Sequence, residues 1–373
     1  MDKLKRFIDI QIPVTTCTLR CHYCYITQTG LFKAALPKMK YSAAQIGLAL
    51  SKERLGGICH FNMCGDGETL LPPEMTDIVK AILEQGHYIM IVTNGTVTVR
   101  FKEMMEQYPP DLKKRLGFKF SFHYLELKKK NLLDKFFSNV QLVKDSGCSF
   151  SLELTPSDEL IPYISDVKKE CIERVGALCH VTVARDETDD DFILLTKHSK
   201  EDYKKIWETF DSDLFDFKIS VFGEKRNEFC YAGVWGGILD LGTGILRACD
   251  KTFLRQNILD DPQKPIDWKP IGVCNKAHCH NAHVWLTLGM IPSLDTPTYS
   301  QMRNRELADG TSWLTPEMNA FLGQKLSDEN VRFSEKEEQK IRSCELRRNF
   351  LWNISYKSKQ AVKKILHVLH IKK

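Results

Sequence analysis

The sequence predicts an α/β fold built on a parallel sheet. From residue 7 to about residue 185, six short apolar runs alternate with longer segments whose apolar residues recur at helical spacing. A helix after each strand is the order that right-handed β–α–β crossovers require. The 43% hydrophobic content of the 373 residues supports a substantial core, and no stretch reaches the roughly 20 apolar residues that span a bilayer.

The expected elements follow from local patterns in chain order. Strands are predicted at 7–12, 57–63, 88–92, 118–122, 150–154 and 180–183. Helices are predicted at 42–55, 72–84, 130–144 and 158–174, the second with proline at its start. After residue 185, an acidic loop at 186–191 interrupts the alternation, and we expect a helix at 203–210 and one more strand at 217–222.

The net charge of +5 arises from the C-terminal tail. Residues 347–373 carry eight basic and no acidic side chains, so the rest of the chain has a net charge of about −3. The body shows no basic stripe of the kind that nucleic-acid binding needs, and we expect no nucleic-acid partner. Thirteen cysteines without an export signal indicate a reducing compartment, so we expect a cytoplasmic protein.

Three cysteines close to the first strand are the strongest functional signal. Cys17, Cys21 and Cys24 form a C-x3-C-x2-C run with an aromatic residue before the last cysteine. Three thiolates can hold three irons of a cubane cluster and leave the fourth iron open to another ligand, whereas clusters that only carry electrons usually have four cysteines. The alternative is a structural zinc site with His22 as its fourth ligand.

This run resembles the signature of the radical S-adenosylmethionine superfamily. The resemblance implies a partial (β/α)6 TIM-like barrel, with the cysteine loop at the mouth formed by the carboxyl ends of the strands. It also implies a 4Fe-4S cluster whose open iron binds S-adenosylmethionine. One-electron cleavage of that cofactor would give a 5′-deoxyadenosyl radical that removes a hydrogen atom from the substrate.

Further residues that fit this resemblance follow the later strands. Residues 64–72 resemble the family's Gly-Gly-Glu-Pro stretch, although Asp66 and Thr69 replace its usual glycine and proline. An Asp-Gly turn alone could explain the segment. The expected cofactor-binding residues are Gly65, Asp66, Gly67, Glu68, Asn94, Ser121, His123 and Glu153. No catalytic residue is assigned, but the candidates are Asp66, Cys64 and His123.

A second metal site is expected in the C-terminal third. Cys230 and Cys249 bracket a probable hairpin around residues 242–244, and Cys274 and Cys279 follow. This pattern resembles the SPASM and Twitch extensions, which carry auxiliary clusters, and it implies one 4Fe-4S cluster held by the four cysteines. A zinc site that includes His278, His280 and His283 is the alternative.

The resemblance and the composition divide the chain into four parts. We expect a barrel over 1–222, an auxiliary-cluster domain over 223–295, a helical segment over 296–345 and a basic amphipathic tail over 346–373. The tail could dock on the body or contact the inner face of a membrane weakly. In the second case, the tail would make the protein peripheral at the inner face of the membrane.

The substrate is the least constrained expectation. With one auxiliary cluster, the chain resembles dehydrogenases of aminocyclitol biosynthesis, so oxidation or epimerisation of a small polyol or sugar is the first expectation. A peptide- or protein-modifying maturase is the alternative. It ranks second because only sixteen residues precede Cys17, so no fused leader-binding module is expected. The resemblance further implies an external one-electron donor of the flavodoxin or ferredoxin type. A non-catalytic zinc-binding interaction protein is the alternative from another class.

Overall fold

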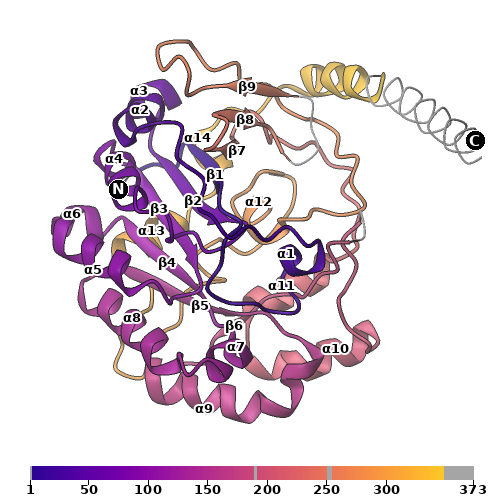
Figure 1. Ribbon diagram of the computed structural model, residues 1–373. Coiled ribbons are helices and arrows are strands. Elements are labelled where there is room, and N and C mark those ends of the chain that lie inside the picture. Colours follow the sequence, from indigo (N-terminus) through magenta and orange to yellow (C-terminus); the bar gives the residue numbers. More distant parts are fainter. Residues whose placement is uncertain (1, 189–190, 250–253, 348–373) are drawn as a thin grey trace, which may run out of the picture.

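A curved sheet forms the centre of the computed structural model, which describes residues 2–188, 191–249 and 254–347 (Figure 1). Within these residues the sheet has nine strands in the order β6-β5-β4-β3-β2-β1-β7-β8-β9. Strands β1 to β6 pair in parallel in chain order, which confirms the predicted α/β class. They are β1 (Arg6–Ile12), β2 (Cys59–Gly65), β3 (Tyr88–Thr93), β4 (Leu116–Ser121), β5 (Ser149–Leu154) and β6 (His180–Val181).

Helices cover the outer face of the parallel strands (Figure 1). The helix expected at 42–55 is two helices, because the side chain of Ser51 caps a new one. The short helix α7 follows β4 ahead of the predicted helix. The covering helices are α2 (Ala43–Ala49), α3 (Lys52–Leu55), α4 (Met75–Glu84), α5 (Thr98–Gln107), α6 (Pro110–Lys113), α7 (Tyr124–Lys129), α8 (Leu133–Asp145) and α9 (Ile164–Val175), the last preceded by the 3-10 turn Asp158–Tyr163.

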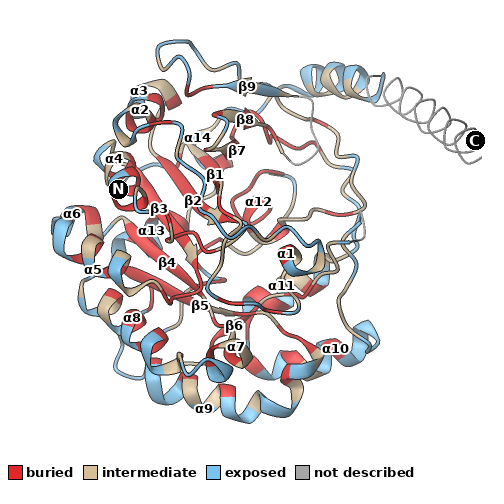
Figure 2. Ribbon diagram, in the orientation of Figure 1, coloured by how far each residue is buried: buried red, intermediate tan, exposed pale blue. Residues whose placement is uncertain are grey.

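The two faces of the sheet differ in chemistry. Outward residues such as Ile8, Phe61 and Phe118 join the apolar core under the helices. Because side chains alternate along a strand, the intervening positions point to the inner face, and several of them are polar: Asp9, Asn62, Lys119, Ser151 and Glu153. Figure 2 shows buried strands surrounded by helices whose outer surfaces are exposed.

A hairpin extends the sheet beyond β1. β7 (Gly236–Asp240) pairs in parallel with β1, and β8 (Ile245–Arg247) and β9 (Arg255–Asn257) add antiparallel strands. The hairpin expected around residues 242–244 is therefore confirmed. A Cβ on Gly236 would lie 2.2 Å from the carbonyl oxygen of Phe7, so glycine permits this close pairing.

The strand expected at 217–222 is wrong. Residues 213–221 form α11 (Asp213–Val221), which follows α10 (Lys200–Trp207) and the 3-10 turn Glu208–Phe210. The side chain of Ser212 accepts a hydrogen bond from the amide of Phe215 and so caps α11, while the short apolar run of the helix mimics a buried strand.

The C-terminal part of the described chain packs against the inner face. Its helices are α12 (Ala282–Trp285), α13 (Pro316–Leu322), α14 (Leu326–Glu329) and a helix over 335–347. Trp285 meets Phe7 edge-on, and Phe321 stacks on Tyr88, so a second apolar core closes the base of the barrel. Among the described residues no helix is long and apolar enough to cross a membrane. The predicted tail helix lies outside them from residue 348 onward.

Candidate active site

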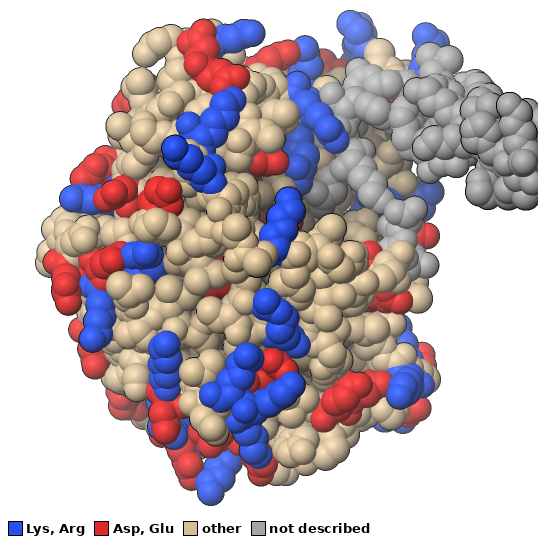
Figure 3. Space-filling model, in the orientation of Figure 1, with Lys and Arg blue, Asp and Glu red and all other residues tan. Residues whose placement is uncertain are grey.

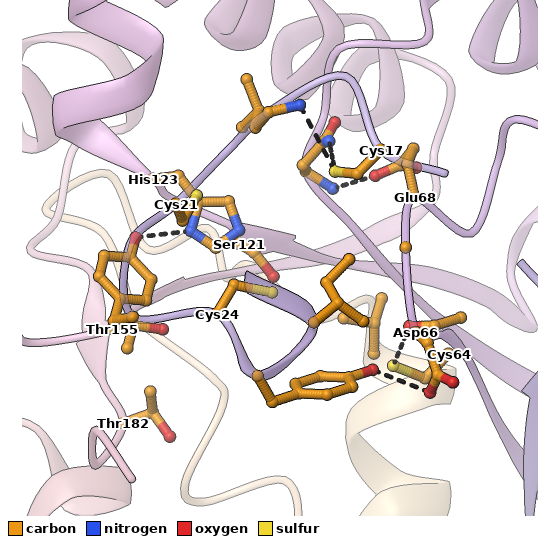
Figure 4. A pocket seen from close by; sticks show the side chains of 18 of the residues that line it. Cys17, Cys21, Cys24, Cys64, Asp66, Glu68, Ser121, His123, Thr155 and Thr182 are labelled. Atoms are coloured by element: carbon orange, nitrogen blue, oxygen red, sulfur yellow. Dashed lines mark hydrogen bonds between the residues drawn. The ribbon is translucent and has the colours of Figure 1, made fainter. Parts of the chain in front are cut away.

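The three N-terminal cysteines lie together at the expected mouth. Cys17, Cys21 and Cys24 follow β1, directly precede the short helix α1 (Tyr25–Gln28), and line one pocket of about 260 Å³ (Figure 4). Burial raises the pKa of all three thiols. In the described part of the chain, no three Cys, His, Asp or Glu side chains already form a metal-binding group. The evidence that Cys17, Cys21 and Cys24 fit an iron–sulfur cluster is therefore the pocket they share and the donor chemistry of their three thiols.

The glycine-containing segment is fixed against the cysteine loop by backbone hydrogen bonds. The amide of Gly67 donates to the carbonyl of Val14 at 2.6 Å, and the amide of Glu68 donates to that of Thr16 at 2.9 Å. A Cβ on Gly67 would lie 2.1 Å from the carbonyl oxygen of Thr16. Glycine is thus required at position 67 because the two loops touch there. The resemblance to the Gly-Gly-Glu-Pro stretch did not reveal this steric reason.

Glu68 joins this segment to the loop after β3. Its side chain is 2% exposed and accepts hydrogen bonds from the hydroxyl of Thr93 at 2.6 Å, the amide of Asn94 at 2.7 Å and the amide of Leu70 at 3.0 Å. Burial raises the pKa of Glu68, and these three bonds act in the opposite direction. Glu68 borders the pocket, but its carboxylate is committed to holding the two loops together.

Asn94 connects the loop after β3 to the first cysteine. Its amide nitrogen donates to the hydroxyl of Thr18 at 2.9 Å and lies 3.4 Å from the sulfur of Cys17. The amide of Leu19 also points to that sulfur, at 3.5 Å. Hydrogen bonds of this kind stabilise a thiolate, so Asn94 is placed to tune whatever Cys17 binds.

Two tyrosines, one within the cysteine run and one directly after it, make contacts that the sequence analysis missed. The hydroxyl of Tyr23 lies 2.7 Å from Nδ1 of His123, and the hydroxyl of Tyr25 donates to Asp66 at 2.9 Å (Figure 4). Burial lowers the pKa of His123 to about 4, which favours a neutral ring. His123 and Asp66, both expected at the cofactor, therefore line the pocket while bonded to residues of the cysteine loop.

The other expected site residues separate into two groups. Gly65, Cys64 and Ser121 line the same pocket. Glu153 is absent from its lining, and its Oε1 lies 3.2 Å from Nε of the fully buried Arg303. The alternative zinc ligand His22 is exposed and pairs with Glu159 at 2.7 Å, which turns it away from the three thiols.

Several further pocket residues lie outside the cysteine and glycine motifs, and one of them, His283 of the alternative zinc set, lines this pocket rather than the cavity of the C-terminal cysteines. They are Thr155, Thr182, Arg185, Glu187, Lys218 and His283. Figure 4 shows Thr182 on the opposite side of the pocket from Cys17 and Glu68. The polar residues that alternate with apolar ones in the strands could have indicated a polar interior, but Lys218 was hidden by the incorrect strand at 217–222.

The four C-terminal cysteines also line one cavity. Cys230, Cys249, Cys274 and Cys279 surround a mainly apolar pocket near α12, together with His278 and His280. Burial raises the pKa of Cys230 to about 12, with a smaller contribution from Cys274 and an opposing one from a backbone hydrogen bond at Ala232. The structure thus brings together residues up to 49 positions apart, in the set that the sequence selected.

A sequence comparison identifies the first half of the barrel. The model of the Radical SAM superfamily matches residues 12–152, whereas no curated protein matches the chain. Among solved structures, SuiB of Streptococcus suis bound to S-adenosylmethionine is similar, with 14% identity and a TM-score of 0.50 over 69% of this chain. This chain spans 65% of SuiB's length.

Two further structures resemble the chain less closely. One is anSMEcpe with bound AdoMet, at 16% identity and a TM-score of 0.48 over 69% of this chain and 80% of the other. The other is archaeal TYW1, at 13% identity and a TM-score of 0.30 over 41% and 49%. At 14% identity, the likeness to SuiB shows the fold alone. Residues 12–152 match the Radical SAM superfamily model, and the cysteine run lies within this match.

Proposed function

We propose that the protein is a radical S-adenosylmethionine enzyme whose cluster is held by Cys17, Cys21 and Cys24. The observation that carries the proposal is that these thiols share one pocket with Gly65–Glu68, Asn94 and Ser121 at the carboxyl ends of the parallel strands. When bound, a 4Fe-4S cluster and S-adenosylmethionine supply one-electron cleavage and a radical able to remove a hydrogen atom from carbon.

The chain's own residues would position the cofactor and exclude water. Backbone contacts between Gly67 and the cysteine loop fix the approach to the open iron, while Glu68 and Asn94 hold the neighbouring loop. Asp66, held by Tyr25, borders the space where a cofactor ammonium would lie. The half-buried pair of Tyr23 and His123 closes another side of the pocket.

The test is anaerobic reconstitution with iron and sulfide, followed by dithionite and S-adenosylmethionine. We expect 5′-deoxyadenosine and methionine by chromatography and a reduced-cluster signal by electron paramagnetic resonance. Replacing Cys17, Cys21 and Cys24 with alanine should abolish the cleavage products and remove this cluster's share of the signal, whereas Cys344→Ala, at an exposed cysteine, should leave both unchanged. Cluster-free but folded wild-type protein, rich in zinc, would instead support the non-catalytic alternative.

We also propose an auxiliary cluster held by Cys230, Cys249, Cys274 and Cys279. The support is their convergence on one cavity. Metal analysis should give about seven to eight irons per chain if both cubanes are full, and Cys230→Ala should remove about four. Zinc in place of iron, together with unchanged iron content in Cys230→Ala, would favour the site with His278 and His280.

A peptide is the substrate that we propose. The first expectation, a polyol or sugar, finds no support among the solved structures, whereas SuiB has also been solved bound to its precursor peptide SuiA. Incubation of the reconstituted enzyme with candidate peptides and, separately, with cyclitols distinguishes the two by mass spectrometry. A mass change in a cyclitol alone would restore the first expectation.

A further inference from the structure

Four cations enter the interior of the barrel from different elements. Lys119 comes from β4, Lys218 from α11, Arg185 follows β6, and Arg303 lies between α12 and α13. Their charges act on one another, since Arg185, Arg303 and Lys119 all disfavour the protonated form of Lys218. Like charges do not gather inside a protein unless something offsets them.

Two of these cations have carboxylate partners. Nε of Arg303 lies 3.2 Å from Glu153, and Nη2 of Arg185 lies 2.5 Å from Glu187. Burial by itself would raise the pKa of Glu153, but the nearby cations, Arg303 foremost, lower it overall. Arg303 and Arg185 are thus largely neutralised by the chain itself.

Lys119 and Lys218 have no carboxylate ion-pair partner among the described residues. Lys119 is 5% exposed and makes no hydrogen bond or ion pair with any described residue. Lys218 donates to the hydroxyl of Thr182 at 2.5 Å and, among the described residues, pairs with no carboxylate. Burial, with Arg185 next, lowers the pKa of Lys218 to about 7. Neither lysine therefore has an ion-pair partner in the described part of the chain.

A neutral hydrogen-bonding group completes this side of the pocket. His283 lines the cavity beside Lys218, and its Nδ1 has no hydrogen-bond partner among the described residues. Burial, followed by the charges of Lys218, Arg303 and Lys119, lowers the pKa of His283 well below its usual value. Its ring can therefore donate or accept without adding charge.

The location separates this group from the cysteines. Lys218 is bonded to Thr182, which Figure 4 places across the pocket from Cys17 and Glu68. A cofactor held at the cysteine loop would leave the Lys218 side for the molecule on which it acts. Several Lys and Arg side chains also lie across the middle of the face in Figure 3, whereas Asp and Glu gather mainly at its rim, which favours entry of an anion.

We propose that Lys218 and His283, which line the pocket, form an oxyanion-binding site for a carboxylate or phosphate group on the substrate, supported by the charge of the buried Lys119. This assignment to the substrate rests on the proposed radical S-adenosylmethionine function. For a peptide, the group would be an acidic side chain, a C-terminal carboxylate or a phosphate. Binding it would supply the counter-charge that the two lysines lack and would fix the substrate at the end of the pocket opposite the cysteines.

Thermal unfolding of the full-length protein tests the site without a known substrate. Inorganic phosphate and acetate are titrated separately, each against potassium chloride at equal ionic strength, because a ligand of the native state raises Tm in a saturable manner. We expect saturable stabilisation, with an apparent Kd at least tenfold weaker in Lys218→Met and Lys119→Met. Lys128→Met, at a half-exposed surface lysine, should behave as wild type.

The outcomes decide both the site and its source. Saturation by phosphate alone indicates a phosphate group, and saturation by acetate as well shows that a carboxylate suffices. If neither anion stabilises wild type beyond chloride, or if both lysine variants respond as wild type does, the proposal is overturned. Should one variant fail to fold, wild type and the other variant still decide.

A calorimetric titration of S-adenosylmethionine distinguishes substrate from cofactor. We expect its Kd for wild type to be the same with and without saturating phosphate. Competition between the two would assign the site to the cofactor's own carboxylate and overturn the assignment to substrate. Because oxyanion binding is measured without reductant, failure of wild type to cleave S-adenosylmethionine would defeat the proposed function and leave this binding result intact.

Discussion

Replacing Glu68 with glutamine should loosen the contact between the glycine-containing segment and the loop after β3. In the variant, one oxygen can still accept from Thr93 and Leu70, but the new amide group faces the amide of Asn94. That buried N–H then lacks an acceptor and a charge-assisted hydrogen bond is lost, which together cost about 2–4 kcal/mol after allowing for the removed buried charge.

The assay is thermal unfolding followed by circular dichroism. At roughly 2.1 cal/mol/K per residue, the unfolding entropy of 373 residues is about 0.8 kcal/mol/K, so the expected fall in Tm is about 3–5 °C. Glu84→Gln is the matched control, because Glu84 is exposed and makes no hydrogen bond or ion pair with described residues. A fall of less than about 1 °C for Glu68→Gln would refute the assignment of its carboxylate as the link between the loops.

Three further changes probe other contacts. Gly67→Ala should sharply reduce soluble yield or Tm, because its Cβ would lie 2.1 Å from a carbonyl of the cysteine loop, and a normal melt would contradict that close approach. Arg303→Met should lower the free energy of unfolding by about 3–5 kcal/mol, or Tm by roughly 4–6 °C, because it leaves Glu153 unpaired. The double variant Arg303→Met/Glu153→Gln should recover most of that stability. No recovery would show that lost packing dominates. Asn94→Ala should lower the midpoint potential of the proposed cluster by about 40 mV, because it removes ~1 kcal/mol of hydrogen bonding to Cys17. A redox titration monitored by electron paramagnetic resonance measures this shift. An unchanged potential would show that Asn94 does not influence that thiolate.

Local patterns in the sequence predicted the parallel strands and the cysteine loop. Alternating apolar runs mark β1 to β6 because each strand is followed by its own helix, and the spacing of Cys17, Cys21 and Cys24 is confined to one short loop. The helical break at Ser51 was missed, since a serine can either interrupt a helix or cap the next one.

Contacts between distant segments were beyond local patterns. The bond between Tyr23 and His123 joins positions 100 residues apart, and nothing in either segment marks the other as its partner. Lys218 was lost because the apolar run of α11 fits a buried strand as well as a helix, and only tertiary packing resolves the two. The parallel pairing of β7 with β1 has no sequence signal of its own either.

That pairing has a consequence for how the two halves of the chain can be exchanged. β1 carries the cysteine loop at its end and is hydrogen-bonded to β2 on one side and to β7 on the other. A truncated protein that stops before residue 223 would expose the second edge of β1, and unprotected strand edges invite aggregation. The hairpin region is consequently no detachable module, and chimeras that graft another extension onto this barrel must supply a replacement strand beside β1.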